Sequence, residues 1–167
     1  MYQESKLVAD GCTFENIDVP SNSEGATFHI HQGSTATFTD CAFSKITGMS
    51  GSAISAILDT QDYWKLYNKM IEGGGDSDQA RDIFISGTSF TDIKADTYGG
   101  AVFLQFYHAQ IINSQFNKNA ATIGGGLYYI NDLENPTNLV IEGTTYEGNT
   151  ATEQGAAIAW SKKPPQI

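Results

Sequence analysis

Residues that could bind a metal ion occur in two places in the chain. Asp76 and Asp78 follow a run of three glycines, as in a glycine-aspartate calcium turn. Calcium takes about six to eight oxygen ligands, and the calcium-binding nonapeptide does not recur in the chain, so we interpret this segment as a solvated loop. His29 and His31 flank Ile30 on an expected strand, which directs both imidazoles to one outward face. Because two ligands do not make a zinc site, we expect a surface pair and no metal or other cofactor.

Charge and length exclude several classes of partner. The 167 residues include 19 acidic and 9 basic side chains, for a net charge of −10 at pH 7, and Arg81 is the sole arginine. A field of that sign repels phosphate groups, so we expect no nucleic acid and no anionic membrane surface as a partner. No apolar run approaches the roughly 18 residues of a membrane span. We expect residues 1–167 to form a single domain with a substantial core.

A pattern of aromatic, small and apolar residues repeats along the chain. Its aromatic positions are Phe14, Phe43, Phe90, Phe116 and Tyr146. Three positions earlier stand residues that tolerate positive φ, which predicts the same sharp corner in every repeat. These corner residues are Gly11, Asp40, Gly87, Asn113 and Gly143. Three positions after the aromatic residue the chain has Ile17, Ile46, Ile93, Asn119 and Asn149.

The aromatic positions are 29, 26 and 30 residues apart in three of the four intervals. Repeats of this length predict a parallel β-helix, in which each repeat is one coil stacked on the next at about 4.8 Å. We therefore expect an all-β solenoid of about five coils, with aromatic and asparagine ladders along its axis. An antiparallel sandwich also has short strands and frequent turns. It does not require one residue type at matching corners, so the β-helix is favoured.

The two cysteines fall in the same column of the repeat. Cys12 and Cys41 each lie two positions before the aromatic residue, and Thr88, Ser114 and Thr144 continue the column. Stacked Cα atoms would lie within the range of a disulfide. The small hydroxyl residues indicate that size is what the position needs, which favours free thiols. Both states remain open from the sequence.

Two short motifs in these repeats resemble polymorphic outer-membrane protein repeats. Gly-Gly-Ala-Val at 99–102 matches the first motif, and Phe-Asn-Lys-Asn at 116–119 matches the second, whereas Phe14, Phe43 and Phe90 are followed by Ile instead of Asn. The resemblance spans residues 7–160. It implies a right-handed parallel β-helix with a structural or adhesive role and an extracellular or cell-surface location. It carries over no catalytic residue.

The interval of 47 between Phe43 and Phe90 locates an insertion at residues 58–82. Within it an apolar stripe that includes Tyr63 and Tyr67 has the spacing of a short helix, which Gly73 to Gly75 would end. We expect this helix to lie on the wall of the solenoid. Trp64 lies off the stripe, so Tyr63, Trp64 and Tyr67 are the candidate residues for contact with a partner or a glycan.

The sequence predicts a protein that is not an enzyme. Pectate-lyase-like enzymes of this fold need clustered carboxylates and basic residues for an anionic sugar, whereas this chain has one arginine and scattered histidines. No serine or cysteine has the context of a nucleophile elbow.

Three functions remain open. The first is a structural or adhesive module, with protein partners or further coils at its open ends, because the nine residues after Ile158 barely cover the last coil and the first coil begins within a few residues of Met1. The second is a carbohydrate-binding or carbohydrate-cleaving β-helix with an exposed aromatic row. Trp64, Tyr107, Tyr129 and Trp160 are candidates for that row. The third is a scaffold subunit whose acidic wall meets basic partners. We expect the chain to be a segment of a longer protein or assembly.

Overall fold

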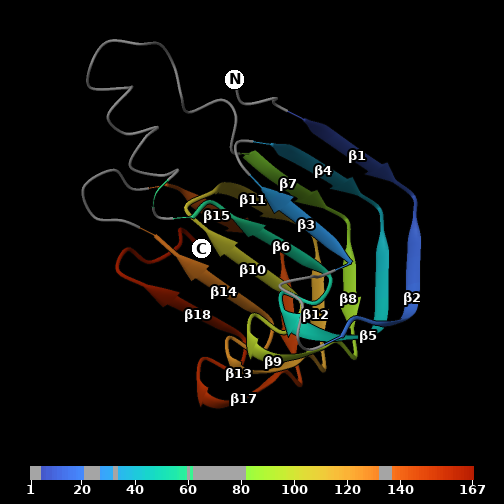
Figure 1. The fold of residues 1–167 in the computed structure, drawn as a ribbon, viewed down its shortest axis with the longest axis vertical. Coiled ribbons are helices and arrows are strands. Elements are labelled where there is room, and N and C mark those ends of the chain that lie inside the picture. Colours follow the sequence, from blue (N-terminus) through green and yellow to red (C-terminus); the bar gives the residue numbers. More distant parts are fainter. Residues whose placement is uncertain (1–4, 21–26, 32–33, 60, 62–81, 132–136) are drawn as a thin grey trace.

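The computed structural model describes residues 5–20, 27–31, 34–59, 61, 82–131 and 137–167 (Figure 1). These residues form three parallel sheets, which we call A, B and C. Sheet A contains β1 (Lys6–Asp10), β4 (Thr35–Thr39), β7 (Asp82–Ser86), β11 (His108–Ile112) and β15 (Leu139–Glu142). Sheet C contains β3 (Phe28–His31), β6 (Ile54–Ile57), β10 (Val102–Gln105), β14 (Leu127–Ile130) and β18 (Ile158–Ser161).

Sheet B is wider because most repeats contribute two short strands to it. It contains β2 (Thr13–Asp18), β5 (Ala42–Ser50), β8 (Ser89–Thr91), β9 (Lys94–Tyr98), β12 (Gln115–Asn117), β13 (Ala120–Ile123), β16 (Thr145–Glu147) and β17 (Thr150–Gln154). The chain passes through sheets A, B and C in order and then returns to sheet A. We call one such passage a coil.

The pairing confirms the predicted all-β, parallel solenoid. Every pairing between the named strands is parallel. Residues at the same place in the repeat are paired from coil to coil in sheet A. The core-facing positions run Ala9, Phe38, Ile85, Ile111 and Ile141. A register that holds over all these strands explains why the repeat spacing was readable in the sequence.

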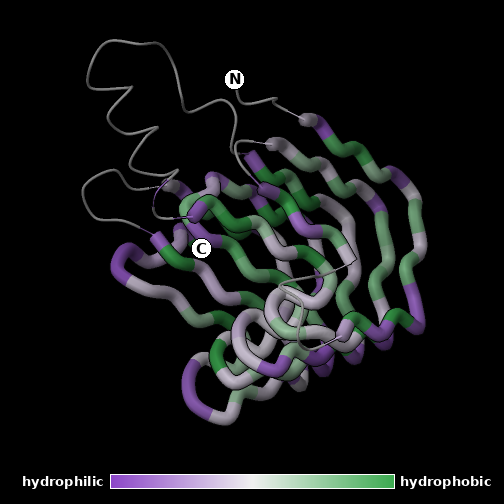
Figure 2. The backbone as a smooth tube through the Cα atoms, viewed as in Figure 1, coloured by the Kyte–Doolittle hydropathy of each residue, from purple (hydrophilic) through white to green (hydrophobic). Residues whose placement is uncertain are grey.

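The core lies between the three sheets. Side chains alternate along each strand, so hydrophobic and hydrophilic residues alternate along the chain (Figure 2). The buried side chains include Phe38, Ile46, Ile85 and Leu127, all fully enclosed. Burying a side chain of this size stabilises a fold by about 1.5–3 kcal/mol.

Left-handed backbone forms the corners between the flat segments. The predicted corner between sheets A and B has φ values of +60° at Gly11, +59° at Gly87 and +58° at Gly143. A second corner inside sheet B was not predicted. It has φ between +53° and +62°, at Asn16, Lys45, Asp92, Lys118 and Gly148.

The C-terminal residues return to sheet A, which the sequence did not predict. Gln166 pairs with Val140 as a parallel bridge beyond β15. The Gln166 N–H donates to Leu139 O at 2.8 Å, and the Ile141 N–H donates to Gln166 O at 2.8 Å. Pro164 and Pro165 have no N–H to donate, but the pairing uses Gln166, which has its own N–H.

The predicted insertion at residues 58–82 lies largely outside the described residues; of it, only 58, 59, 61 and 82 are described. No helix among the described residues is long and apolar enough to cross a membrane.

Candidate binding groove on sheet A

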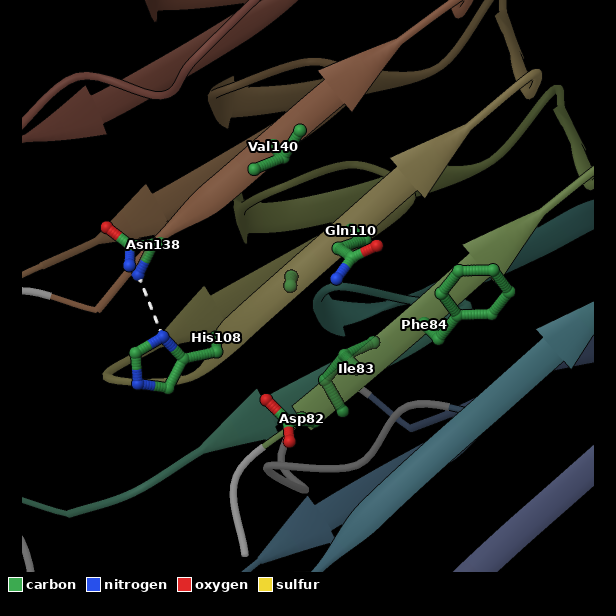
Figure 3. A pocket seen from close by; sticks show the side chains of 8 residues that line it. Asp82, Ile83, Phe84, His108, Gln110, Asn138 and Val140 are labelled. Carbon is green, nitrogen blue, oxygen red and sulfur yellow. Dashed lines mark hydrogen bonds between the residues drawn. The ribbon is translucent and has the colours of Figure 1, made fainter. Parts of the chain in front are cut away.

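A groove of about 550 Å³ lies on the outward face of β7, β11 and β15 (Figure 3). Strand alternation directs two rows of side chains into it. One row contains Asp82, His108 and Asn138, and the other contains Phe84, Gln110 and Val140. Asp82 is directly paired with His108, and Gln110 with both Phe84 and Val140. Ile83 and Ala109 form the floor, and their side chains belong to the core.

Hydrogen bonds hold the side chains at one end of the groove in place. The main-chain N–H of Asn138 donates to His108 Nδ1 at 3.0 Å. A neutral His108 therefore carries its proton on Nε2, where it is a donor. Lys163 Nζ donates to Asn138 Oδ1 at 3.2 Å. The groove end thus contains an imidazole in a defined tautomer beside a carboxylate and an amide.

The groove combines hydrogen-bonding groups with an apolar strip. Asp82 accepts hydrogen bonds, while Gln110 and Asn138 both donate and accept them. Phe84 and Val140 supply apolar contact along the same face. A neutral sugar ring has hydroxyls at its edge and C–H groups on its face, so this lining can bind it. Among the described lining residues Asp82 supplies the only carboxylate, whereas glycoside hydrolysis usually needs two.

The groove residues had a detectable signal in the sequence. The first row lies eight positions before the repeated aromatic residue, and the second row six positions before it. Those columns change residue type from coil to coil. The repeat is recognisable only from its constant columns, so these variable positions were not predicted.

The structure brings the predicted aromatic residues together as one stack inside the solenoid. The ring centroids of Phe14 and Phe43 lie 4.8 Å apart, and those of Phe43 and Phe90 lie 5.2 Å apart. Phe116 follows at 4.6 Å from Phe90, and Tyr146 at 4.7 Å from Phe116. The rings are tilted by 11° to 24° from parallel. Phe43, Phe90 and Phe116 are buried in this column, whereas Phe14 and Tyr146 at its ends are half-buried, so the column is mainly structural.

The two predicted asparagines bond one coil to the next. Asn119 Nδ2 donates to Phe90 O at 3.1 Å, and Asn119 Oδ1 accepts the Ile93 N–H at 3.0 Å. Asn149 repeats both bonds, to Phe116 O at 2.9 Å and from the Asn119 N–H at 2.9 Å. Asn119 is fully buried. Its role is to satisfy main-chain groups at the second corner.

Of the proposed aromatic contact residues, the structure describes only Tyr107, Tyr129 and Trp160. Tyr63, Trp64 and Tyr67 lie outside the described residues. Tyr107 and Tyr129 were candidates for an exposed row, but both are fully buried, so that expectation was wrong. Both belong to the hydrophobic core, which the sequence periodicity did not reveal. Trp160, on β18, is 50% exposed.

Neither cysteine forms a disulfide. Cys12 is half-buried and Cys41 is buried. Burial raises the pKa of the Cys41 thiol. No group of three or more metal-ligating side chains occurs in the part of the chain that the structure describes.

Comparison with known proteins gives no match: no protein-family model, no curated protein and no solved structure is similar enough to be matched to this chain.

Proposed function

We propose that the chain is a non-enzymatic structural or adhesive module of a surface protein or a large assembly, built as a right-handed β-helix of about five coils. The observation that carries this proposal is that the repeated residues make contacts between coils. The aromatic, asparagine and corner columns all join one coil to the next. A chain whose recurring residues serve its own stacking has the design of a rigid spacer or platform.

The resemblance to polymorphic outer-membrane protein repeats supports a surface location. Both motifs behind it have a physical role in this chain. A Cβ on Gly100 would lie 2.7 Å from Ala120 O, and Asn119 closes the second corner of the preceding coil. A position without room for a Cβ, and a side chain that bonds to the main chain of the next coil, are expected in other stacks of such coils.

Location can be tested on cells of the source with antibodies raised against this chain. If the chain is a surface module, the antibodies should label intact cells as strongly as permeabilised cells. Labelling only after permeabilisation, together with recovery in a large complex with basic proteins, would instead indicate the scaffold subunit. Further coils or protein partners at the ends are part of both proposals.

Carbohydrate binding is the second candidate, and the groove on sheet A is the observation that favours it. We propose that an adhesive module of this type uses the groove for a neutral glycan. The charge of −10 disfavours an anionic one. No nucleic-acid partner and no membrane span are proposed.

A glycan array tests the groove. Gln110→Ala removes an amide at its centre, and Gln115→Ala removes the same group from the outward face of β12 as a matched control. We expect the wild type and Gln115→Ala to bind neutral glycans on the array, and Gln110→Ala not to bind them. The absence of binding, or equal binding by both variants, would contradict it.

A further inference from the structure

We propose that His29 and His31, on β3, bind a divalent transition-metal ion through their Nε2 atoms. The sequence alone indicated a surface pair of histidines. Two details of the side-chain arrangement lead further.

The first detail is the convergence of the two imidazoles. Ile30 lies in the core with 5% exposure, so the histidines on either side of it share the outward face of sheet C. Their ring centroids are 4.0 Å apart, with 59° between the planes. The two Nε2 atoms point at each other and are in direct contact. This contact is a hydrogen bond in which the tautomers decide which Nε2 donates, and a metal ion between the two nitrogens would replace the bridging proton.

The second detail is a buried hydroxyl on the neighbouring strand. Ser55, on β6, is paired directly with His29 and shares its outward face. Its side chain is fully buried, and Oγ has no hydrogen-bond partner among the described residues. A buried polar atom without a partner is costly. Water bound to a metal ion beside His29 would supply that partner.

The ligand type selects the class of metal. Imidazole nitrogens suit zinc, copper and nickel, whereas calcium and magnesium prefer oxygen. The two imidazoles are the ligands that the described residues supply, and they leave coordination positions for water. Copper(II) is expected to bind most tightly, because it stands highest in the general order of affinity for nitrogen sites. The net charge of −10 favours the approach of any cation.

The test titrates the purified chain with copper(II) and with zinc, and records the copper spectrum by electron paramagnetic resonance. The variants are His29→Ala, His31→Ala and, as a control, His108→Ala, which removes the third histidine of the chain. We expect one ion per chain, with two imidazole couplings, in the wild type and in His108→Ala. Each of the other variants should show one coupling and an affinity at least about tenfold lower. Ser55→Ala should weaken binding by about tenfold.

Thermal unfolding of the metal-free variants controls for folding, because His29 and His31 lie outside the core. Three outcomes would overturn the proposal. They are no binding beyond that of the double variant His29→Ala/His31→Ala, unchanged binding by both single variants, or an equal loss in His108→Ala. The last two would place the ion elsewhere on this acidic chain, and the first would leave a shared proton between the rings.

Discussion

The side chain of Asp40 occupies the space in which a Cβ on Gly87 would lie, and that Cβ would overlap Asp40 Oδ1. The two residues form the same corner in neighbouring coils, with φ values of +50° and +59°. Asn113 and Gly143 repeat the relationship. The corner can therefore hold the side chain of Asp40 or Asn113 because the neighbouring coil has a glycine at the same corner.

This relationship predicts unequal effects of the same substitution at two corners. Gly87→Ala and Gly11→Ala both place a side chain at φ near +60°, which costs about 1–2 kcal/mol. Gly87→Ala also meets Asp40, whereas nothing lies within 4 Å of a Cβ on Gly11. Because Asp40 Oδ1 is the end of an exposed side chain that can rotate away, we expect Gly87→Ala to lower the free energy of unfolding by only about 0.5–1.5 kcal/mol more than Gly11→Ala.

Urea unfolding of both variants measures the difference. Asp40→Gly in the Gly87→Ala background should recover part of the extra loss, because it removes the overlapping side chain. Equal losses for the two single variants would show that the corner strain alone matters.

Asn119 should be essential to the join between two coils. Asn119→Ala leaves Phe90 O and the Ile93 N–H without their partner in a fully buried position. Each unpaired buried group costs about 1–3 kcal/mol. We expect a loss of about 2–5 kcal/mol in the free energy of unfolding, measured by urea titration.

Asn149→Ala is the matched control, because Asn149 makes the same two bonds but is only half-buried. Its loss should be smaller. Asn119→Ile, which introduces the residue of the first three coils, should not restore stability. Full stability of Asn119→Ile would mean that the position needs only bulk.

The thiol of Cys41 should be replaceable by a hydroxyl. Cys41 Sγ donates to Thr39 O at 3.3 Å and to Ala9 O at 3.5 Å, and Thr88 Oγ1 makes the corresponding bonds one coil later. The side chains of threonine and valine have nearly the same shape, but only Cys41→Thr keeps a hydrogen-bond donor. We expect Cys41→Thr to be more stable than Cys41→Val by about 1 kcal/mol in thermal or urea unfolding. Equal stabilities would show that size alone selects this column.

Stability should fall in alkaline solution because of two tyrosines. Burial raises the pKa of Tyr129 to about 12, with its hydrogen bond to Thr137 acting in the opposite direction, and burial also raises the pKa of Tyr146. Below about pH 10 both hydroxyls are protonated in the folded and unfolded states. Between about pH 10 and 12 the unfolded chain releases protons that the folded chain retains, so the free energy of unfolding decreases as pH rises.

Unfolding measured from about pH 8 to pH 12 checks this slope. The Tyr146 hydroxyl is buried without a hydrogen bond among the described residues. Tyr146→Phe should therefore keep full stability at neutral pH and reduce the alkaline decrease. A wild-type curve that stays flat to pH 12 would mean that both hydroxyls reach solvent.

The sequence predicted those parts of the fold in which one residue type recurs at a constant spacing. The aromatic column and the first corner were found because Phe and Gly recur there. The second corner was missed because Lys45 and Lys118 adopt φ of +53° and +55°. Lysine has no local preference for that conformation, so stacking between coils imposes it.

The groove was missed for a different reason. Asp82 and His108 occupy one place in the repeat but differ in type, and their meeting depends on the lateral register of β7 and β11. Burial of Tyr107 and Tyr129 was missed because neither belongs to the constant columns of the repeat. Constant columns thus report the stack, whereas variable columns on its outward face hold the candidate site.

Two phenylalanines on consecutive strands test most directly whether the constant columns stabilise the stack and the variable outward columns do not. Phe90 lies in the internal stack with no exposure, and Phe84 lies on the outward face in the groove. We expect Phe90→Ala to lower the free energy of unfolding by about 3–5 kcal/mol. We expect Phe84→Ala to lower it by about 1 kcal/mol or less. Equal losses, or a larger loss for Phe84→Ala, would contradict the claim that the repeated column holds the solenoid together and leaves the outward face for binding.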